Sequence, residues 1–285
     1  MGVVNSKEDT RAYREGYPGK QDDPKIKDNL LFYRNERKSE PHGAKIDTIH
    51  KPVELGGWFG DYELLERHHG YIQWLFPIRE QGMNGLSFEL QLHEAKAIRK
   101  DPECKKRVLK SYQLMLNFYG MKLVDKETGQ IGRDRHWKER YRHLNSSFHN
   151  YLRITRILKS LGELGFEHFK WPFLKFVLTE IYEHDQLENT KRSCLNFWSQ
   201  VLRNEDEQQE MRRVVKQYEG VESSSSEDED QDDDDDDDND NINHNNKKND
   251  NDSDSDSEKK SFQPNPVVVA HKKRVKVRKV KKPKE

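Results

Sequence analysis

Apolar side chains recur at intervals of three and four residues through the middle of the chain, which is the spacing of amphipathic helices. In the clearest stretch, Tyr151, Ile154 and Leu158 share one side of a helix. Short connections between about seven such helices predict an all-α fold, a multi-helix bundle. The pattern and its capping residues predict helices that begin near Asp61, Gln91, Asp101, Trp137, Tyr151, Pro172 and Thr190.

Two stretches depart from this periodicity. In residues 121–133, turn residues from Asp125 to Gly129 separate two short extended pieces, which predicts a β-hairpin. In the helix that begins near Thr190, charged residues dominate beyond Arg203. We therefore expect this helix to fray into the residues that follow.

Composition divides the 285 residues into four segments. Residues 1–28 form a polar N-terminal arm with an aromatic island at 13–18, and residues 29–218 are rich in aromatics and hold all five tryptophans. Residues 219–270 are acidic and predicted to be disordered, because they bury too little apolar surface to offset the entropy of ordering. Residues 271–285 form a basic tail, so a net charge of -1 hides a strong asymmetry.

Several functional classes lack their sequence signatures. Cys104 and Cys194 have no metal-ligand spacing and lie in apolar stretches, so we expect buried free thiols in a reducing compartment. No run approaches the ~20 apolar residues of a membrane span, and no secretion signal is evident. Catalytic and phosphate-binding motifs are absent, and histidines such as His136 and His143 are interpreted as surface or capping residues. We therefore expect a soluble intracellular binding protein rather than an enzyme, with no metal and no cofactor.

Four motifs resemble the opioid growth factor receptor family and occur in the order found there. They are NLLFYRNE at 29–36, YIQWLFPIRE at 71–80, LMLNFYG at 114–120 and NYLRITRILKSLGELG at 150–165. The resemblance spans roughly residues 11–215, and residues 51–57 look like an insertion relative to the family. It implies a nuclear or perinuclear protein that binds an enkephalin-type peptide and restrains cell proliferation.

A candidate ligand-binding set lies in the second motif. An enkephalin-like peptide offers a cationic amine, two aromatic rings and a carboxylate, so its site should combine a carboxylate, aromatic rings and an arginine. Tyr71, Trp74, Arg79 and Glu80 supply these groups within ten residues. Packing in the core is the alternative role for Tyr71 and Trp74, and it is the role we favour for those two side chains.

A second candidate set lies in the fourth motif. Arg153, Arg156 and Lys159 recur every three residues on the side of the helix opposite its apolar face. Cations at this spacing could grip a phosphate or an acidic partner. The alternative is a solvated polar face, which we favour because charged helix faces usually lie in water.

The two ends of the chain carry candidates for modification and addressing. Residues 1–6 fit the N-myristoylation pattern, with Gly2 as the acceptor. Serines among acidic residues are candidates for acidophilic kinases, namely Ser226, Ser253, Ser255 and Ser257. A basic cluster fits a nuclear-localisation signal and consists of Lys272, Lys273, Arg274 and Lys276.

The basic cluster is compatible with several kinds of partner. It fits a nuclear import receptor, an anionic membrane contact supported by acylation of Gly2, or nucleic acid, which we regard as less favoured but open. It also fits a tail neutralised by the acidic run. The leading hypothesis is therefore a peptide-binding regulatory protein, and the alternative is a membrane-peripheral or nuclear scaffold or adaptor held by its ends.

Overall fold

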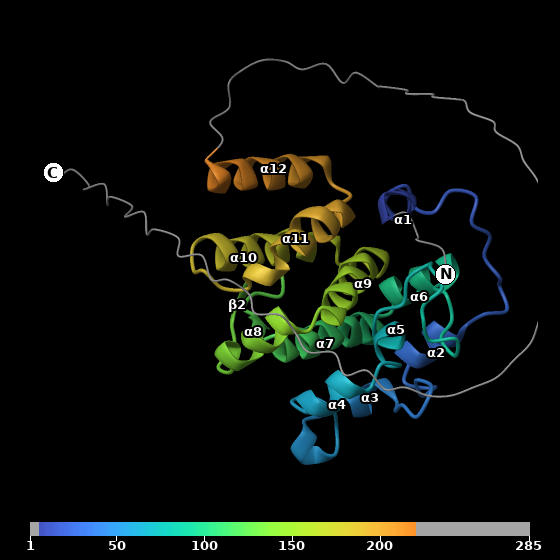
Figure 1. Cartoon of the computed structure of the whole chain (residues 1–285). Coiled ribbons are helices and arrows are strands. Elements are labelled where there is room, and N and C mark those ends of the chain that lie inside the picture. The colour runs from blue at the N-terminus through green and yellow to red at the C-terminus, as the bar shows by residue number, and fades with distance from the viewer. Residues whose placement is uncertain (1–5, 221–285) are drawn as a thin grey trace, which may run out of the picture. The chain divides into compact units, whose positions relative to one another are not determined.

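The computed structural model describes residues 6–220, and helices dominate them (Figure 1). Twelve α-helices lie within this part of the chain, so the predicted all-α class is confirmed, although several of them are single turns. The α-helices are α1 (Ser6–Arg14), α2 (Asp28–Tyr33), α3 (Ile46–Ile49), α4 (Tyr62–Arg67), α5 (Ile72–Leu75), α6 (Leu92–Lys100), α7 (Pro102–Phe118), α8 (Trp137–Ser146), α9 (His149–Glu163), α10 (Lys170–Tyr182), α11 (Lys191–Ser193) and α12 (Glu205–Glu219). The 3-10 turns are η1 (Val53–Leu55), η2 (Glu167–Phe169), η3 (Glu188–Thr190) and η5 (Ser199–Val201), and η4 (Cys194–Trp198) is a π-helical turn.

The long helices α7, α9 and α10 form the centre of this part of the chain, with shorter helices around them (Figure 1). Each buries one apolar stripe against the others, as Tyr112 on α7, Ile154 on α9 and Phe173 on α10 illustrate. Cys104 and Cys194 are buried free cysteines in the same core, as the sequence predicts. Burial of these apolar side chains is the main force that stabilises the domain.

Helix starts follow the capping residues that the sequence offers. The Asp61 carboxylate accepts a hydrogen bond from the Leu64 amide at 3.0 Å and so caps α4. The Asp101 carboxylate accepts from the amides of Glu103 and Cys104, at 2.9 and 3.2 Å, and caps α7 with Pro102 as its first residue. These bonds satisfy amides that have no partner inside their own helix.

Replacing Asp101 by alanine should remove both of these bonds and lower the free energy of unfolding by about 1 kcal/mol. Chemical denaturation followed by circular dichroism measures the change. Asp125→Ala is a matched control, because the Asp125 carboxylate accepts from the Glu127 amide at 2.8 Å in an exposed turn outside any helix. A loss at Asp101 no larger than the loss at Asp125 would contradict the capping role.

The predicted hairpin is present as two short antiparallel strands. Strand β1 (Met121–Leu123) pairs with β2 (Ile131–Arg133), with Met121 opposite Arg133. The turn contains Gly129 at a positive φ of 77°, where an added Cβ would lie 2.7 Å from the ring of Phe169. The turn therefore needs glycine both for its backbone conformation and for close packing against η2.

The prediction that the last helix frays is wrong. The helical turns from α11 to η5 stop at Leu202, and Asn204 then caps a new helix, α12, by accepting from the amides of Asp206 and Glu207. Three acidic residues in its first turn favour this helix through its dipole. The helix packs against α10, where the rings of Tyr182 and Tyr218 stack at 4.7 Å between centroids.

The N-terminal residues expected as a polar arm also take part in the fold. Residues 6–14 form α1, and Tyr13 on this helix is fully buried in the core. Tyr17, just beyond the helix, is 8% exposed. The folded domain therefore begins in α1 rather than at residue 29.

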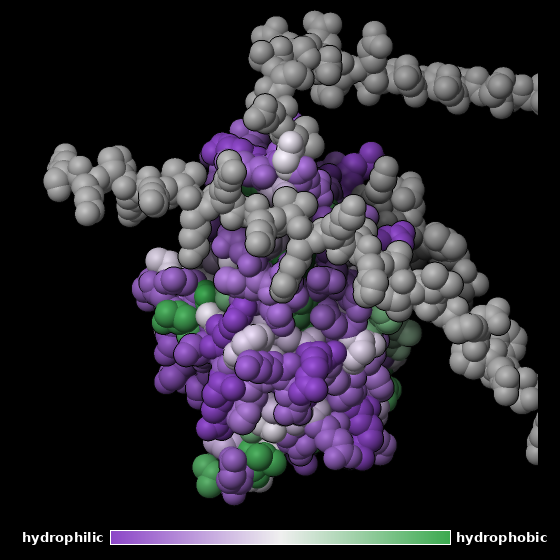
Figure 2. Space-filling view, turned by 60° about the vertical axis from the view of Figure 1, so that its left-hand side comes forward, coloured by the Kyte–Doolittle hydropathy of each residue, from purple (hydrophilic) through white to green (hydrophobic). Residues whose placement is uncertain are grey.

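The surface shown in Figure 2 is mainly hydrophilic, with hydrophobic residues in small separate patches. Within residues 6–220, the helices are all too short or too polar to cross a membrane. Several sequence candidates lie outside the described residues, namely Gly2, Ser226, Ser253, Ser255, Ser257, Lys272, Lys273, Arg274 and Lys276. The predictions for residues 221–285 likewise concern a part of the chain that the structure does not describe.

Candidate functional site

A buried tyrosine on an otherwise exposed loop marks the candidate site. Residues 15–20, which we call the Tyr17 loop, follow α1, and Tyr17 is their one buried residue. The loop turns through positive φ angles at Gly16 (76°), Tyr17 (60°) and Gly19 (76°). A left-handed conformation costs a residue with a side chain about 1 kcal/mol. Contacts of the Tyr17 side chain must therefore hold the loop in place.

Those contacts are made with two polar residues that follow α5. The Tyr17 hydroxyl donates a hydrogen bond to Oε1 of Glu80 at 2.6 Å. The guanidinium of Arg79 lies 5.8 Å from the centroid of the Tyr17 ring, within range of a cation–π interaction. Burial and the neighbouring Glu80 carboxylate raise the pKa of Tyr17, so its hydroxyl stays a donor at neutral pH.

Arg79 holds both ends of the Tyr17 loop. Its two amino groups donate to the carbonyls of Gly16 and Lys20, each at 3.3 Å, and one of them also pairs with Asp22 at 3.0 Å. The residue is only 2% exposed. Its Nε has no hydrogen-bond partner among residues 6–220, so the buried guanidinium keeps one unused donor.

Glu80 joins the Tyr17 loop to α9. The same Oε1 atom that accepts from Tyr17 lies 2.8 Å from Nζ of Lys159. Lys159 is 2% exposed, whereas the Glu80 side chain is 22% exposed. Glu80 from the first candidate set and Lys159 from the second are thus ion-paired in one site, although 79 positions separate them in the sequence.

Tyr71 and Trp74 do not belong to this site. Both are fully buried, and the hydroxyl of Tyr71 and the indole nitrogen of Trp74 donate to the carbonyls of Leu65 and Glu40 at 3.1 and 3.0 Å. The ring of Trp74 lies 5.5 Å from that of Phe32 in the core. The core-packing role expected for these two residues is confirmed, and only Arg79 and Glu80 of the four lie beneath the Tyr17 loop.

The interpretation of Arg153, Arg156 and Lys159 as a solvated face is wrong. Arg153 is 6% exposed and donates to the carbonyls of Leu65 and Glu66 at 3.1 and 3.2 Å. Nε of Arg156 donates to the Phe76 carbonyl at 2.9 Å, and burial lowers the pKa of this arginine to about 10.

The physical reason lies in the short helices that this face covers. The one-turn or two-turn helices α4 and α5 end abruptly and leave carbonyls without helical partners. The arginines of α9 donate to those carbonyls, so these cations serve the fold and are not presented to a phosphate.

Two histidines converge on Glu66, a contact that spacing along the chain does not predict. Nε2 of His143 and Nε2 of His149 lie 3.2 and 2.9 Å from the same Glu66 oxygen. Burial lowers the pKa of His143. No group of three or more histidine, cysteine or acidic residues in the described part of the chain has an arrangement that could hold a metal ion.

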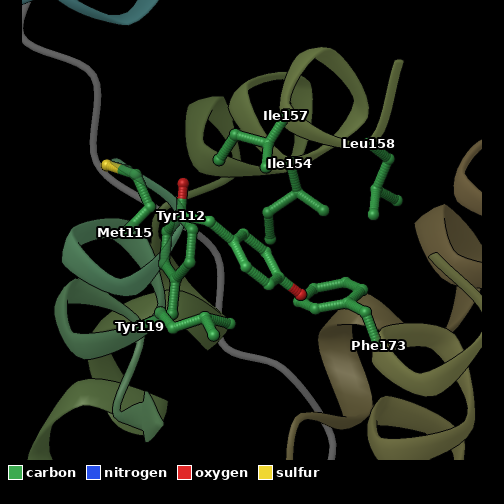
Figure 3. A pocket seen from close by; sticks show the side chains of 8 residues that line it. Tyr112, Met115, Tyr119, Ile154, Ile157, Leu158 and Phe173 are labelled. Carbon is green, nitrogen blue, oxygen red and sulfur yellow. The ribbon is translucent and has the colours of Figure 1, made fainter. Parts of the chain in front are cut away.

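A small cavity between the central helices offers no ligand site. Side chains from α7, α9 and α10 line it and leave about 10 Å³ (Figure 3). That volume has room for about one water molecule. A ligand that takes over the hydrogen bonds of Tyr17 to Glu80 and of Arg79 to Gly16 and Lys20 must instead displace the Tyr17 loop.

The fold and the site define an all-α domain with a polar site that one of its own loops closes. A family model described as the opioid growth factor receptor conserved region matches residues 22–226. The chain belongs to the opioid growth factor receptor family, which is named for a receptor and not for an enzyme.

Curated relatives agree with this assignment. The chain is 44% identical over 212 residues to "Opioid growth factor receptor-like protein 1" of Mus musculus, a match that covers 74% of the chain and 44% of the relative. It is 41% identical to "Opioid growth factor receptor" of Rattus norvegicus, with 72% and 35% covered, and 42% identical to that of Homo sapiens, with 68% and 28% covered. The chain spans less than half the length of these relatives. No solved structure matches it significantly.

Proposed function

We propose that the chain is a regulatory binding protein that takes an enkephalin-type peptide and restrains cell proliferation, and that the peptide binds beneath the Tyr17 loop. The names of the relatives as receptors for an opioid growth factor support the ligand class. The observation that carries the site is a tyrosine of the chain itself, buried on an exposed loop, with its hydroxyl on Glu80 and its ring beside Arg79.

The chemistry of Tyr17 suggests how such a peptide would bind. A tyrosine of the peptide would take the place of Tyr17, donate its hydroxyl to Glu80 and lie against the guanidinium of Arg79. Displacement of the loop would also free the amino groups of Arg79 from the carbonyls of Gly16 and Lys20. A planar guanidinium can then bind the peptide carboxylate with two hydrogen bonds.

Replacing Tyr17 by phenylalanine should raise the affinity of the full chain for enkephalin. The substitution removes the bond that holds the loop on Glu80, and a hydrogen bond to a charged group contributes about 1.5–3 kcal/mol. Because the loop must leave before the peptide binds, a less stable closed state raises the apparent affinity about tenfold or more. Isothermal titration calorimetry with enkephalin and a scrambled peptide measures this effect.

Two further variants make the test specific. Tyr218→Phe removes a comparable hydroxyl bond, 2.5 Å long, to Glu183, and should leave peptide affinity unchanged. Glu80→Gln keeps the size of the side chain but removes its charge, and should abolish the gain that Tyr17→Phe brings. Equal affinities of the wild type and Tyr17→Phe, or equal binding of the scrambled peptide, would refute the proposed site.

A further inference from the structure

A basic cleft lies on another part of the domain, between the residues at the end of α3 and the first half of α7. It is an open depression of about 360 Å³, a volume in the range of small-molecule sites. One face of α7 lines the cleft, because its lining residues recur at intervals of three and four, namely Glu103, Lys106, Arg107 and Lys110. The other wall comes from the residues that follow the start of α3, namely Asp47, His50, Lys51 and Pro52.

The cations of the cleft outnumber its carboxylates. Arg107 donates to both oxygens of Asp47, at 2.8 and 2.9 Å, so this pair is internally neutral. Lys106 lies 3.7 Å from Glu103, which neutralises a second pair. Among residues 6–220, neither Lys51 nor Lys110 forms an ion pair, and the four cations and two carboxylates give the cleft a net charge of +2.

The imidazole of His50 forms a polar part of the cleft wall. Its Nε2 lies 2.9 Å from the hydroxyl oxygen of Ser111, whereas its Nδ1 has no hydrogen-bond partner within the described residues. Burial, followed by the charge of Lys110, lowers the pKa of His50 to about 3. The ring is thus neutral at physiological pH, and the positive charges around it are those of the lysines and Arg107.

We propose that this cleft binds a phosphate monoester, with Lys51 and Lys110 as the charges that recognise the phosphate dianion. Two unpaired ammonium groups match the charge of about -2 that a phosphate monoester carries near neutral pH. Ammonium groups act as point charges toward phosphate, without the planar geometry that arginine requires. The site is independent of the Tyr17 loop, because the two share no residue.

Calorimetric titration of the full chain with O-phosphoserine tests the proposal, and unphosphorylated serine provides the ligand control. The variant Lys51→Gln/Lys110→Gln should bind O-phosphoserine at least about tenfold more weakly than the wild type. The control variant Lys105→Gln/Lys175→Gln removes the same charge from two exposed lysines outside the cleft and should bind within about twofold of the wild type.

Inorganic phosphate and a phosphoserine peptide distinguish the source of the phosphate. Comparable affinities for inorganic phosphate and O-phosphoserine would support the site and assign it to a free phosphate compound. Tighter binding of the peptide would support it and assign it to a phosphorylated side chain of a partner. Absence of saturable binding to the wild type, or an equal loss in the control variant, would overturn the proposal.

Discussion

Replacing Trp74 by alanine is expected to lower the free energy of unfolding by about 3–5 kcal/mol, the usual cost of deleting a buried aromatic ring. The side chain is fully buried, packs against Phe32 and donates a hydrogen bond to the Glu40 carbonyl. The substitution leaves a cavity and removes one of the two hydrogen bonds to the Glu40 carbonyl, which keeps the bond from the Asn84 side-chain amide at 2.7 Å. Urea denaturation monitored by circular dichroism measures the loss, which is a large fraction of the stability of a typical domain.

Phe148→Ala is a matched control for Trp74→Ala, because Phe148 is an aromatic residue that is 65% exposed. Its removal should change the free energy of unfolding by no more than about 0.5 kcal/mol. If Trp74→Ala kept wild-type stability but lost peptide binding, Trp74 would be a ligand residue, and its assignment to the core would be wrong.

Replacing Arg153 by alanine is expected to cost about 3 kcal/mol or more, because it leaves buried acceptors without their charged donor. The Leu65 and Glu66 carbonyls and the Asn150 side-chain oxygen all accept from this guanidinium. Arg153→Lys should recover only part of the loss, because an ammonium group cannot reproduce the planar fork. The same denaturation experiment compares the variants.

Arg142→Ala supplies the comparison for Arg153, since Arg142 is an exposed arginine on the neighbouring helix α8. A solvated arginine contributes little to stability, and this variant should stay within about 0.5 kcal/mol of the wild type. Equal stabilities of the two alanine variants would show that the cations of α9 form a solvated face after all.

Local features of the fold could be predicted from the sequence because they depend on neighbouring residues. The caps at Asp61 and Asp101 each need one side chain and amides two or three positions away. The hairpin between β1 and β2 likewise follows from turn residues within one short stretch. Helix α12 was missed because charged residues dominate it, although Met211 is buried and Val214, Val215 and Tyr218 pack against the core.

The candidate site depends on contacts that periodicity does not report. The sequence identifies Arg79 and Glu80 as candidate ligand-binding residues from their chemistry. It does not identify their partner Tyr17, which lies 63 residues from Glu80. The pattern of α9 correctly separates an apolar from a basic side, but it does not show that α4 and α5 end beneath the basic side. Helix ends that lack caps of their own explain why these cations are buried.

The effect of enkephalin on hydrogen–deuterium exchange of the full chain tests the proposed site most directly. In the closed loop, the amides of Gly16, Tyr17 and Lys20 donate to backbone carbonyls and should exchange slowly. If the peptide replaces Tyr17, exchange in residues 15–20 should become faster and exchange around Arg79 and Glu80 slower. Unchanged exchange of the Tyr17 loop under saturating peptide, or protection confined to another part of the chain, would contradict the proposal.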